Sequence, residues 1–180
     1  MPVREQSPEV LVADDSIAVV DRAALRDLSG RLPRAPRGRV RLCTHRSSDE
    51  LLHEMLIVLQ GGSYIRPHKH RGKAESFHLI EGRVDIVFFD DEGAITNVLD
   101  MAAYGSGQPF YYRIGESVYH TLMVRSDTLV YHEVTTGPFR REDTLFAPWA
   151  PEEGHDAAIR EWNGGLESRL REFAGTSGVR

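Results

Sequence analysis

Cysteine is almost absent from this chain of 180 residues, which contains Cys43 and no second thiol. A single cysteine excludes an internal disulfide framework and any zinc cluster built from several thiolates. Long hydrophobic runs are also missing, because no apolar stretch approaches the roughly 20 residues that span a bilayer. The first residues, MPVREQSPEV, lack the apolar segment of a signal peptide, so we expect a cytoplasmic protein without a membrane partner.

The chain has no excess of basic residues. Its 22 Lys and Arg are outnumbered by 27 Asp and Glu, the net charge is −5, and the basic residues are scattered. A surface that binds nucleic acid needs clustered cations, so we expect no nucleic-acid partner. The one Arg-rich run, RLPRAPRGRVR from Arg31 to Arg41, is interpreted as a solvated connector or an oligomer contact rather than an anion site.

Short segments rich in β-branched and aromatic residues fill the middle of the chain. About seven of them follow one another between Glu50 and Val134 at a spacing of roughly 8–12 residues, separated by turns that contain Gly or Asp. No helical pattern lies between them. This arrangement predicts an antiparallel β-sandwich or barrel over residues 50–140.

The two flanks of this region have different patterns. Residues 1–49 form an N-terminal extension with a short helix predicted at about residues 21–32, N-capped by Asp21. Residues 141–180 contain a proline-rich segment and a C-terminal helix that packs on the barrel or on a dimer partner. Gly164 and Gly165 weaken that helix by roughly 1 kcal/mol each relative to alanine, so we expect a break there.

Two histidines and a glutamate lie between strand-forming segments in the sequence GSYIRPHKHRGKAESFHLIEG, residues 62–82. Residues two apart on a strand point to the same face, so His68 and His70 share a face, and the alternation also includes Tyr64 and Arg66. Glu75 begins the next strand after a tight turn, which returns its carboxylate to the same end of the barrel. Two imidazoles and a carboxylate on rigid strands suit a divalent transition metal.

A fourth ligand is expected from a distant strand, and His120 is the best candidate because it follows a turn and opens a strand. An isolated buried histidine is more often a hydrogen-bonded core residue than a ligand, and we interpret His53, His78 and His132 in that way. The combined pattern G-x5-H-x-H-x4-E-x6-G is much more specific than any single histidine or His-x-His pair.

This pattern, Gly62-x5-His68-x-His70-x4-Glu75-x6-Gly82, matches the first cupin motif at every specified position. The second cupin motif, P-x-G-x-x-H, corresponds to GESVYH, where only His120 matches because glycine and serine replace the proline and glycine. Four segments together resemble the WbuC-type cupin-fold metalloproteins from about Asp21 to Glu153: LHEMLIVLQGGSYIRPHKHRGKAESFHLIEG, FFDDEG, HEVTTGPF and FAPWAPEE.

The resemblance implies an all-β, cupin-type antiparallel β-barrel (a double-stranded β-helix or jelly roll) with short flanking helices. It also implies one divalent metal ion held by His68, His70, Glu75 and His120, and a connection with bacterial surface polysaccharide. Three neutral imidazoles and one carboxylate leave such an ion with a net charge of about +1, and about two positions open if it is six-coordinate. These ligands do not choose between Fe, Zn, Mn and Ni.

Further residues are candidates for contact with a substrate. Glu133, on a late strand, is a candidate general base, and Tyr112 is a candidate acid. Candidate substrate-binding residues are Arg66, Lys73, Tyr64 and Tyr119. For Arg66 the alternative is a structural salt bridge, for Lys73 it is a solvated turn, and for the tyrosines it is core packing.

Three functions fit these residues. We favour a metal-dependent enzyme of small polar carbonyl compounds, such as an isomerase or epimerase of sugars or sugar nucleotides, because a metal stabilises the enediolate formed by proton abstraction. The alternatives are an Fe(II)-dependent oxygenase and a non-catalytic module that binds a metal or a small ligand. A homodimer is expected.

Overall fold

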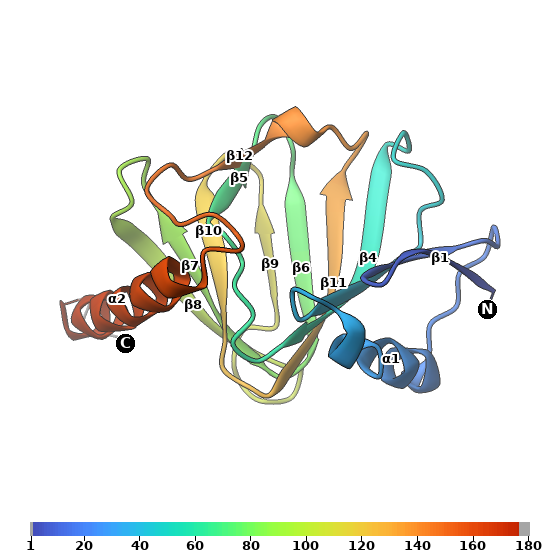
Figure 1. Ribbon diagram of the computed structural model, residues 1–180, viewed down its shortest axis with the longest axis horizontal. Coiled ribbons are helices and arrows are strands. Elements are labelled where there is room, and N and C mark those ends of the chain that lie inside the picture. Colours follow the sequence, from blue (N-terminus) through green and yellow to red (C-terminus); the bar gives the residue numbers. More distant parts are fainter. Residues whose placement is uncertain (1, 177–180) are drawn as a thin grey trace.

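Two β-sheets packed face to face form the body of the molecule in the computed structural model, which describes residues 2–176 (Figure 1). In spatial order, the larger sheet contains β1 (Val3–Ser7), β2 (Val10–Ala13), β3 (Arg39–Cys43), β4 (Leu52–Gln60), β11 (Thr128–Thr136), β6 (Glu75–Glu81) and β9 (Tyr111–Ile114). The smaller sheet contains β12 (Thr144–Phe146), β5 (His68–His70), β10 (Tyr119–Val124), β7 (Arg83–Phe89) and β8 (Ile95–Ala102).

Neighbouring strands are antiparallel except for the parallel pair β2–β3. The helices are α1 (Arg22–Ser29), α2 (Asp156–Thr176) and the short 3-10 turns η1 (Leu32–Arg34) and η2 (Arg141–Asp143). The predicted all-β class is therefore confirmed, as a jelly-roll sandwich of two hydrogen-bonded sheets rather than one continuous closed barrel. Within residues 2–176, no helix combines the length and the apolar character needed to cross a membrane.

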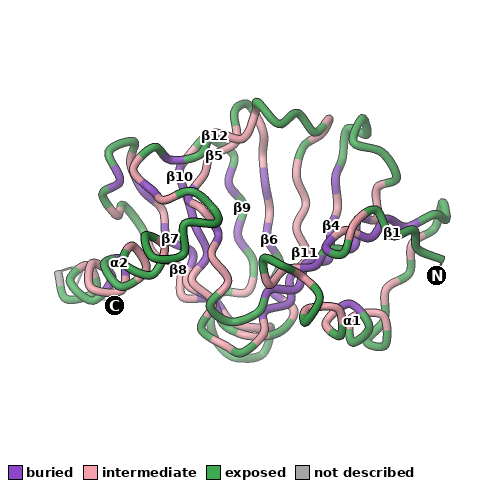
Figure 2. The backbone as a smooth tube through the Cα atoms, in the orientation of Figure 1, coloured by how far each residue is buried: buried purple, intermediate pink, exposed green. Residues whose placement is uncertain are grey.

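The main core lies between the two sheets, where alternate residues of each strand point inward. Figure 2 shows buried backbone along the facing strands, with exposed residues at the turns and ends. The larger sheet contributes mainly aliphatic and aromatic side chains from β4, β11 and β6, and the smaller sheet contributes them from β7 and β10. The most buried of these side chains are Leu59, Phe77, Leu79, Val84, Ile86 and Leu129.

Helix α1 covers part of the outer face of the larger sheet. As predicted, Asp21 caps its N-terminus, because the carboxylate accepts a hydrogen bond from the backbone N–H of Ala24 at 2.9 Å. Leu28 is buried against Val40 and Val58 of the sheet. The helix ends at Ser29, and a separate turn, η1, covers the last part of the predicted range.

Helix α2 packs on the outer face of the smaller sheet, against a second apolar layer that contains Val87 and Phe89. It runs without interruption through Gly164 and Gly165, so the predicted break is wrong. Trp162 on one side of the glycines and Leu166 on the other both pack into this layer, and their burial holds the helix together across the weak point.

The glycine that ends the first motif is required by the local geometry. Gly82 has φ +95°, a left-handed conformation, and a Cβ there would lie 2.5 Å from both the Ser126 side chain and the Thr128 carbonyl oxygen. This tight turn joins β6 of the larger sheet to β7 of the smaller one and so fixes the direction in which β6 enters the sandwich.

Replacement of Gly164 or Gly165 by alanine should raise the free energy of unfolding by about 1 kcal/mol for each substitution. Both glycines are exposed helical residues, and a Cβ at either position would meet no atom within 4 Å. Urea denaturation followed by circular dichroism measures the change. Gly82→Ala is a control with the opposite expected sign and should lower the free energy of unfolding. A loss of stability on substitution of Gly164 or Gly165 would contradict the placement of α2.

Candidate metal centre

Three imidazoles converge on the inner side of the smaller sheet. His68 and His120 are directly opposite each other on β5 and β10, and their ring centroids are 4.7 Å apart. The ring of His70 lies 5.0 Å from His68 and 6.2 Å from His120. The alternation along β5 and its pairing with β10 bring residues from distant parts of the chain into one group.

Glu75 reaches this group from the other sheet. It is the first residue of β6, it is buried, and its Oε2 lies 3.3 Å from Nε2 of His70. Its other oxygen, Oε1, lies 3.5 Å from Nε2 of His120. The sandwich therefore brings together the four side chains that the sequence proposes as ligands, with one carboxylate between two imidazoles.

The other nitrogen of each ring is turned away from the centre. Nδ1 of His68 donates to the Arg66 carbonyl oxygen at 2.9 Å, and Nδ1 of His120 donates to the Val118 carbonyl oxygen at 3.1 Å. Nδ1 of His70 lies 3.2 Å from Oγ1 of Thr144. A carbonyl acceptor places the proton of a neutral imidazole on Nδ1, which leaves Nε2 as an acceptor or a metal ligand.

Protonation of the cluster follows from these contacts. Burial alone would raise the pKa of Glu75, but hydrogen bonds from His120 and His70 outweigh it and hold that pKa well below its usual range. Burial lowers the pKa of His120, yet its hydrogen bond to Glu75 prevails and the pKa is raised. Burial and the neighbouring imidazoles lower the pKa of His68 to about 3. Without a metal, a proton between His120 and Glu75 therefore balances the carboxylate charge.

The types of donor in this set suit a metal ion. Two atoms bound to one ion at about 2.1 Å lie at most about 4.2 Å apart, and the 3.3 and 3.5 Å contacts of Glu75 are within this limit. A cation at this position would replace the shared proton. Even so, no group of three or more His, Cys, Asp or Glu side chains in residues 2–176 is arranged so that it could hold a metal ion, and His68 is the imidazole without an ion-pair contact to Glu75.

Glu133 and Tyr112 lie on the same inner wall as Glu75. Phe77 of β6 is paired with Glu133 of β11 on one side and with Tyr112 of β9 on the other, and it is two residues from Glu75. The hydroxyl of Tyr112 is buried and has no hydrogen-bond partner in the described part of the chain. Burial, reinforced by the charge of Glu75, raises the pKa of Glu133 to about 8. This wall thus presents two proton-carrying groups beside the cluster.

Arg66 lies at the edge of the cluster. Its guanidinium is stacked over the ring of Phe146 at 5.0 Å, and that ring is 6.2 Å from His68. Nη2 donates to the Ala147 carbonyl oxygen at 3.4 Å, and Nη1 is 3.6 Å from Glu152. Its Nε–H is buried and finds no acceptor among the residues that the structure describes, so one strong donor of this side chain remains available.

Two other candidate substrate contacts have partners outside the cluster in this structure. Nζ of Lys73 donates to the carbonyl oxygens of Thr136 and Pro138 at 3.1 and 2.5 Å, so this lysine ties two loops together. Tyr119 points to the opposite face of β10 from His120, because adjacent residues of a strand alternate. It packs against Trp149 under α2, with Nζ of Lys69 4.3 Å from its ring centre.

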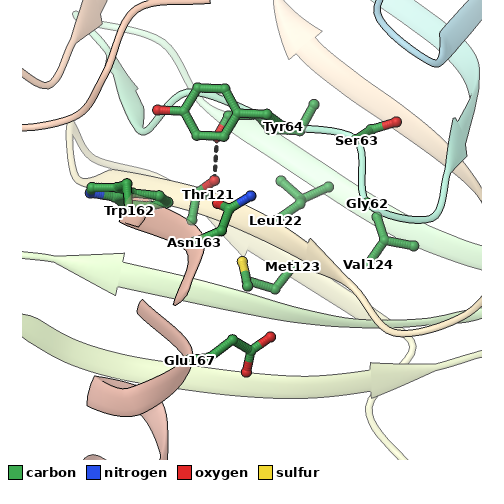
Figure 3. A pocket seen from close by; sticks show the side chains of 11 residues that line it. Gly62, Ser63, Tyr64, Thr121, Leu122, Met123, Val124, Trp162, Asn163 and Glu167 are labelled. Atoms are coloured by element: carbon green, nitrogen blue, oxygen red, sulfur yellow. Dashed lines mark hydrogen bonds between the residues drawn. The ribbon is translucent and has the colours of Figure 1, made fainter. Parts of the chain in front are cut away.

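Tyr64 also lies elsewhere, because β5 begins only at His68 and the predicted alternation does not extend back to it. It lines a cleft of about 170 Å³ between residues 62–65, the outer face of β10 and α2 (Figure 3). Its hydroxyl donates to the Pro151 carbonyl oxygen at 2.8 Å, and burial raises its pKa to about 12. A wider cleft of about 400 Å³ beside Trp149 and Arg169 is also outside the cluster.

Thr144 and Phe146 are neighbours of the cluster that sequence reasoning missed. They belong to β12, which pairs with β5 so that Thr144 is opposite His70 and Phe146 is opposite His68. A strand of three residues carries too little alternation to be recognised in a proline-rich segment. The sequence pattern therefore places this segment on the flank of the barrel.

Comparison with known proteins supports the fold. A family described as a domain of unknown function (DUF6016) matches residues 20–101, and no curated protein matches in sequence. A solved Shewanella oneidensis protein has a TM-score of 0.51 and 13% identity over 62% of this chain and 75% of its own. A Silicibacter pomeroyi sugar phosphate isomerase of the cupin superfamily has a TM-score of 0.43 and 19% identity over 56% and 60% of the two chains.

Lactobacillus farciminis oxalate decarboxylase has a TM-score of 0.42 and 19% identity over 55% of this chain and 28% of its own. The matched region thus covers less than two thirds of the length of each enzyme, whereas it covers three quarters of the length of the Shewanella protein. The likeness to the Shewanella protein supports the predicted all-β jelly-roll fold class, and the isomerase is described as a member of the cupin superfamily.

Acidification should destabilise the metal-free protein through His68. The pKa of His68 is about 3 in the folded chain and about 6.5 in an unfolded chain. Between these values only the unfolded chain binds the proton, so stability falls as the pH falls, by up to about 1.4 kcal/mol per pH unit. Urea unfolding at about pH 7 and about pH 5 should show a larger loss for the unsubstituted protein than for His68→Gln.

The matched control for this experiment is His78→Gln, which removes an exposed imidazole from the outer face of β6. It should lose as much stability on acidification as the unsubstituted protein. Equal losses for all three proteins would show that His68 is not held as a neutral imidazole.

Proposed function

We propose that this protein is a WbuC-type cupin enzyme that holds one divalent transition metal ion through His68, His70, Glu75 and His120. Its substrate would be a small polar carbonyl compound, such as a sugar or sugar nucleotide of surface polysaccharide metabolism, and its reaction an isomerisation or epimerisation. The observation that carries the proposal is the orientation of the imidazoles, which turn Nδ1 outward while Nε2 of His70 and His120 faces one buried carboxylate.

The cluster is open on one side. His68, His70 and Glu133 are partly exposed, whereas Glu75 and His120 are buried. A bound divalent ion would supply a Lewis acid that polarises a substrate carbonyl and stabilises an enediolate. Iron, zinc, manganese and nickel all accept this ligand set.

Glu133 would take a proton from the substrate as a base and return one as an acid. The pKa of about 8 leaves this carboxyl mainly protonated at neutral pH, and part of the shift comes from the charge of Glu75. When that charge is offset by a cation, the pKa of Glu133 falls toward neutrality, the range in which a carboxyl serves as both acid and base.

Tyr112 and Arg66 would bind the substrate oxygens. The buried hydroxyl of Tyr112 and the buried Nε–H of Arg66 are donors without acceptors among residues 2–176. Unpaired buried donors are costly to leave unsatisfied, and a polar ligand removes that cost. They therefore favour a substrate with several oxygen atoms over an apolar one.

The protein purified without chelators should contain about one divalent transition metal ion per chain. Glu75→Gln and His120→Gln should each weaken metal binding by about 100-fold or more, because a lost ligand costs at least as much as a lost outer-shell partner. Elemental analysis and competition with a chromophoric chelator measure both quantities. His78→Gln is the matched control and should bind the metal normally, whereas a protein that binds no ion under any reconstitution would disprove the proposal.

Substitution of the acid–base groups should remove turnover and leave the metal in place. Glu133→Gln and Tyr112→Phe should lower kcat by about 10²- to 10⁴-fold, while Tyr111→Phe, on the exposed outer face of the same strand, should have no effect. Mass spectrometry on a panel of sugars, sugar phosphates and nucleotide sugars would identify the reaction. Oxygen consumption coupled to turnover with Fe(II) would favour the oxygenase instead. Binding of these compounds without formation of any product would exclude an enzyme that acts on them.

A further inference from the structure

The Arg-rich run contains three arginines that form ion pairs and two exposed arginines, Arg34 and Arg41, that form none within residues 2–176. Arg31 binds Glu5 at 2.7 Å, and Arg37 binds Glu9 at 2.5 Å. Arg39 binds Glu153 at 2.8 Å. Arg41 is exposed, and within residues 2–176 its guanidinium forms no ion pair with a carboxylate.

Arg41 lies on the wall of the sandwich that carries Glu133. On β3, Arg41 pairs with Ile57 and Cys43 pairs with Met55, and both partners are residues of the inner core. Met55 in turn pairs with Glu133. Because paired residues of neighbouring strands share a face, Arg41 is on the inner face, two strands from Glu133. Its positive charge acts on the Glu133 carboxyl and favours its ionised form.

The segment that holds Arg66 reaches the same edge of the sandwich. Glu152 contacts Arg66 at 3.6 Å, and the next residue, Glu153, binds Arg39 at 2.8 Å. Arg39 and Arg41 are two residues apart on one face of β3, about 6.6 Å along the strand. Two consecutive glutamates thus link the loop carrying Arg66 to the strand carrying Arg41.

We infer that Arg41 determines the substrate class of this site by binding an anionic group, a phosphate or a carboxylate, on a small carbonyl compound. The inference rests on the proposed function, since it concerns the same site. A guanidinium binds either anion through two parallel hydrogen bonds. The charge balance agrees, because the metal-loaded cluster carries about +1 and Arg41 adds a second positive charge without a partner. Arg66, with its free Nε–H, supplies the second contact.

Anion binding to the metal-loaded protein tests this inference. Isothermal titration calorimetry with inorganic phosphate in one series and malonate in another distinguishes the two anionic groups. Arg41→Gln should weaken binding of the preferred anion by about 10- to 100-fold, the usual effect of losing a charged hydrogen-bonded contact. Arg41→Lys should restore part of the affinity, since it keeps the charge and loses the paired geometry.

Arg22→Gln is the matched control, because it removes one positive charge from the exposed surface of α1. It should bind both anions with unchanged affinity. Arg41→Gln should also keep the urea midpoint of the unsubstituted protein, because no ion pair is lost. Equal affinity of Arg41→Gln and the unsubstituted protein, or no binding of either anion, would overturn the inference.

Metal content separates this inference from the proposed function. If the protein holds no metal and Arg41→Gln still weakens anion binding, the role of Arg41 in anion binding is supported and the proposed metal enzyme is disproved. If the metal is bound and Glu133 is needed for turnover, but Arg41→Gln changes neither anion affinity nor KM, only the assignment of Arg41 fails.

Discussion

The contact of one buried carboxylate with two imidazoles across the sandwich is the constraint on which the site depends. Glu75 enters from the larger sheet, and His70 and His120 are carried by the smaller one. A buried carboxylate facing two nitrogen lone pairs is unfavourable unless a cation lies between them. The fold therefore stabilises a positive charge at this one point, and either a proton or a metal ion can supply that charge.

The surroundings of this point follow from the same sheet geometry. Glu133 and Tyr112 flank Phe77 on the inner wall, so their proton-carrying groups share the environment that raises the pKa of both side chains. Arg41 lies on the same face of the larger sheet as Glu133, and Arg66 stacks on Phe146 beside His68. A substrate with a carbonyl at one end and a negative charge at the other matches this distribution of charge.

Much of this was accessible from the sequence, and the failures have physical reasons. The first motif located His68, His70 and Glu75, because their positions depend on strand period and one tight turn. The partners of Tyr119 and Lys73 were not accessible from the sequence, since the face of a strand and the contacts of a turn lysine depend on residues distant in sequence. The break at Gly164 and Gly165 was predicted from local propensity, which the burial of Trp162 and Leu166 overrides.

The short strand β12 gives the cluster a sensitivity of its own. Thr144 is held opposite His70 by only three residues of pairing at the edge of the smaller sheet. A slip of this strand by a single residue would bring Leu145 into that position and turn the hydroxyl away, because side chains alternate between faces. The imidazole of His70 would then lose the contact that fixes its ring, so the register of an edge strand sets the orientation of the His70 side chain.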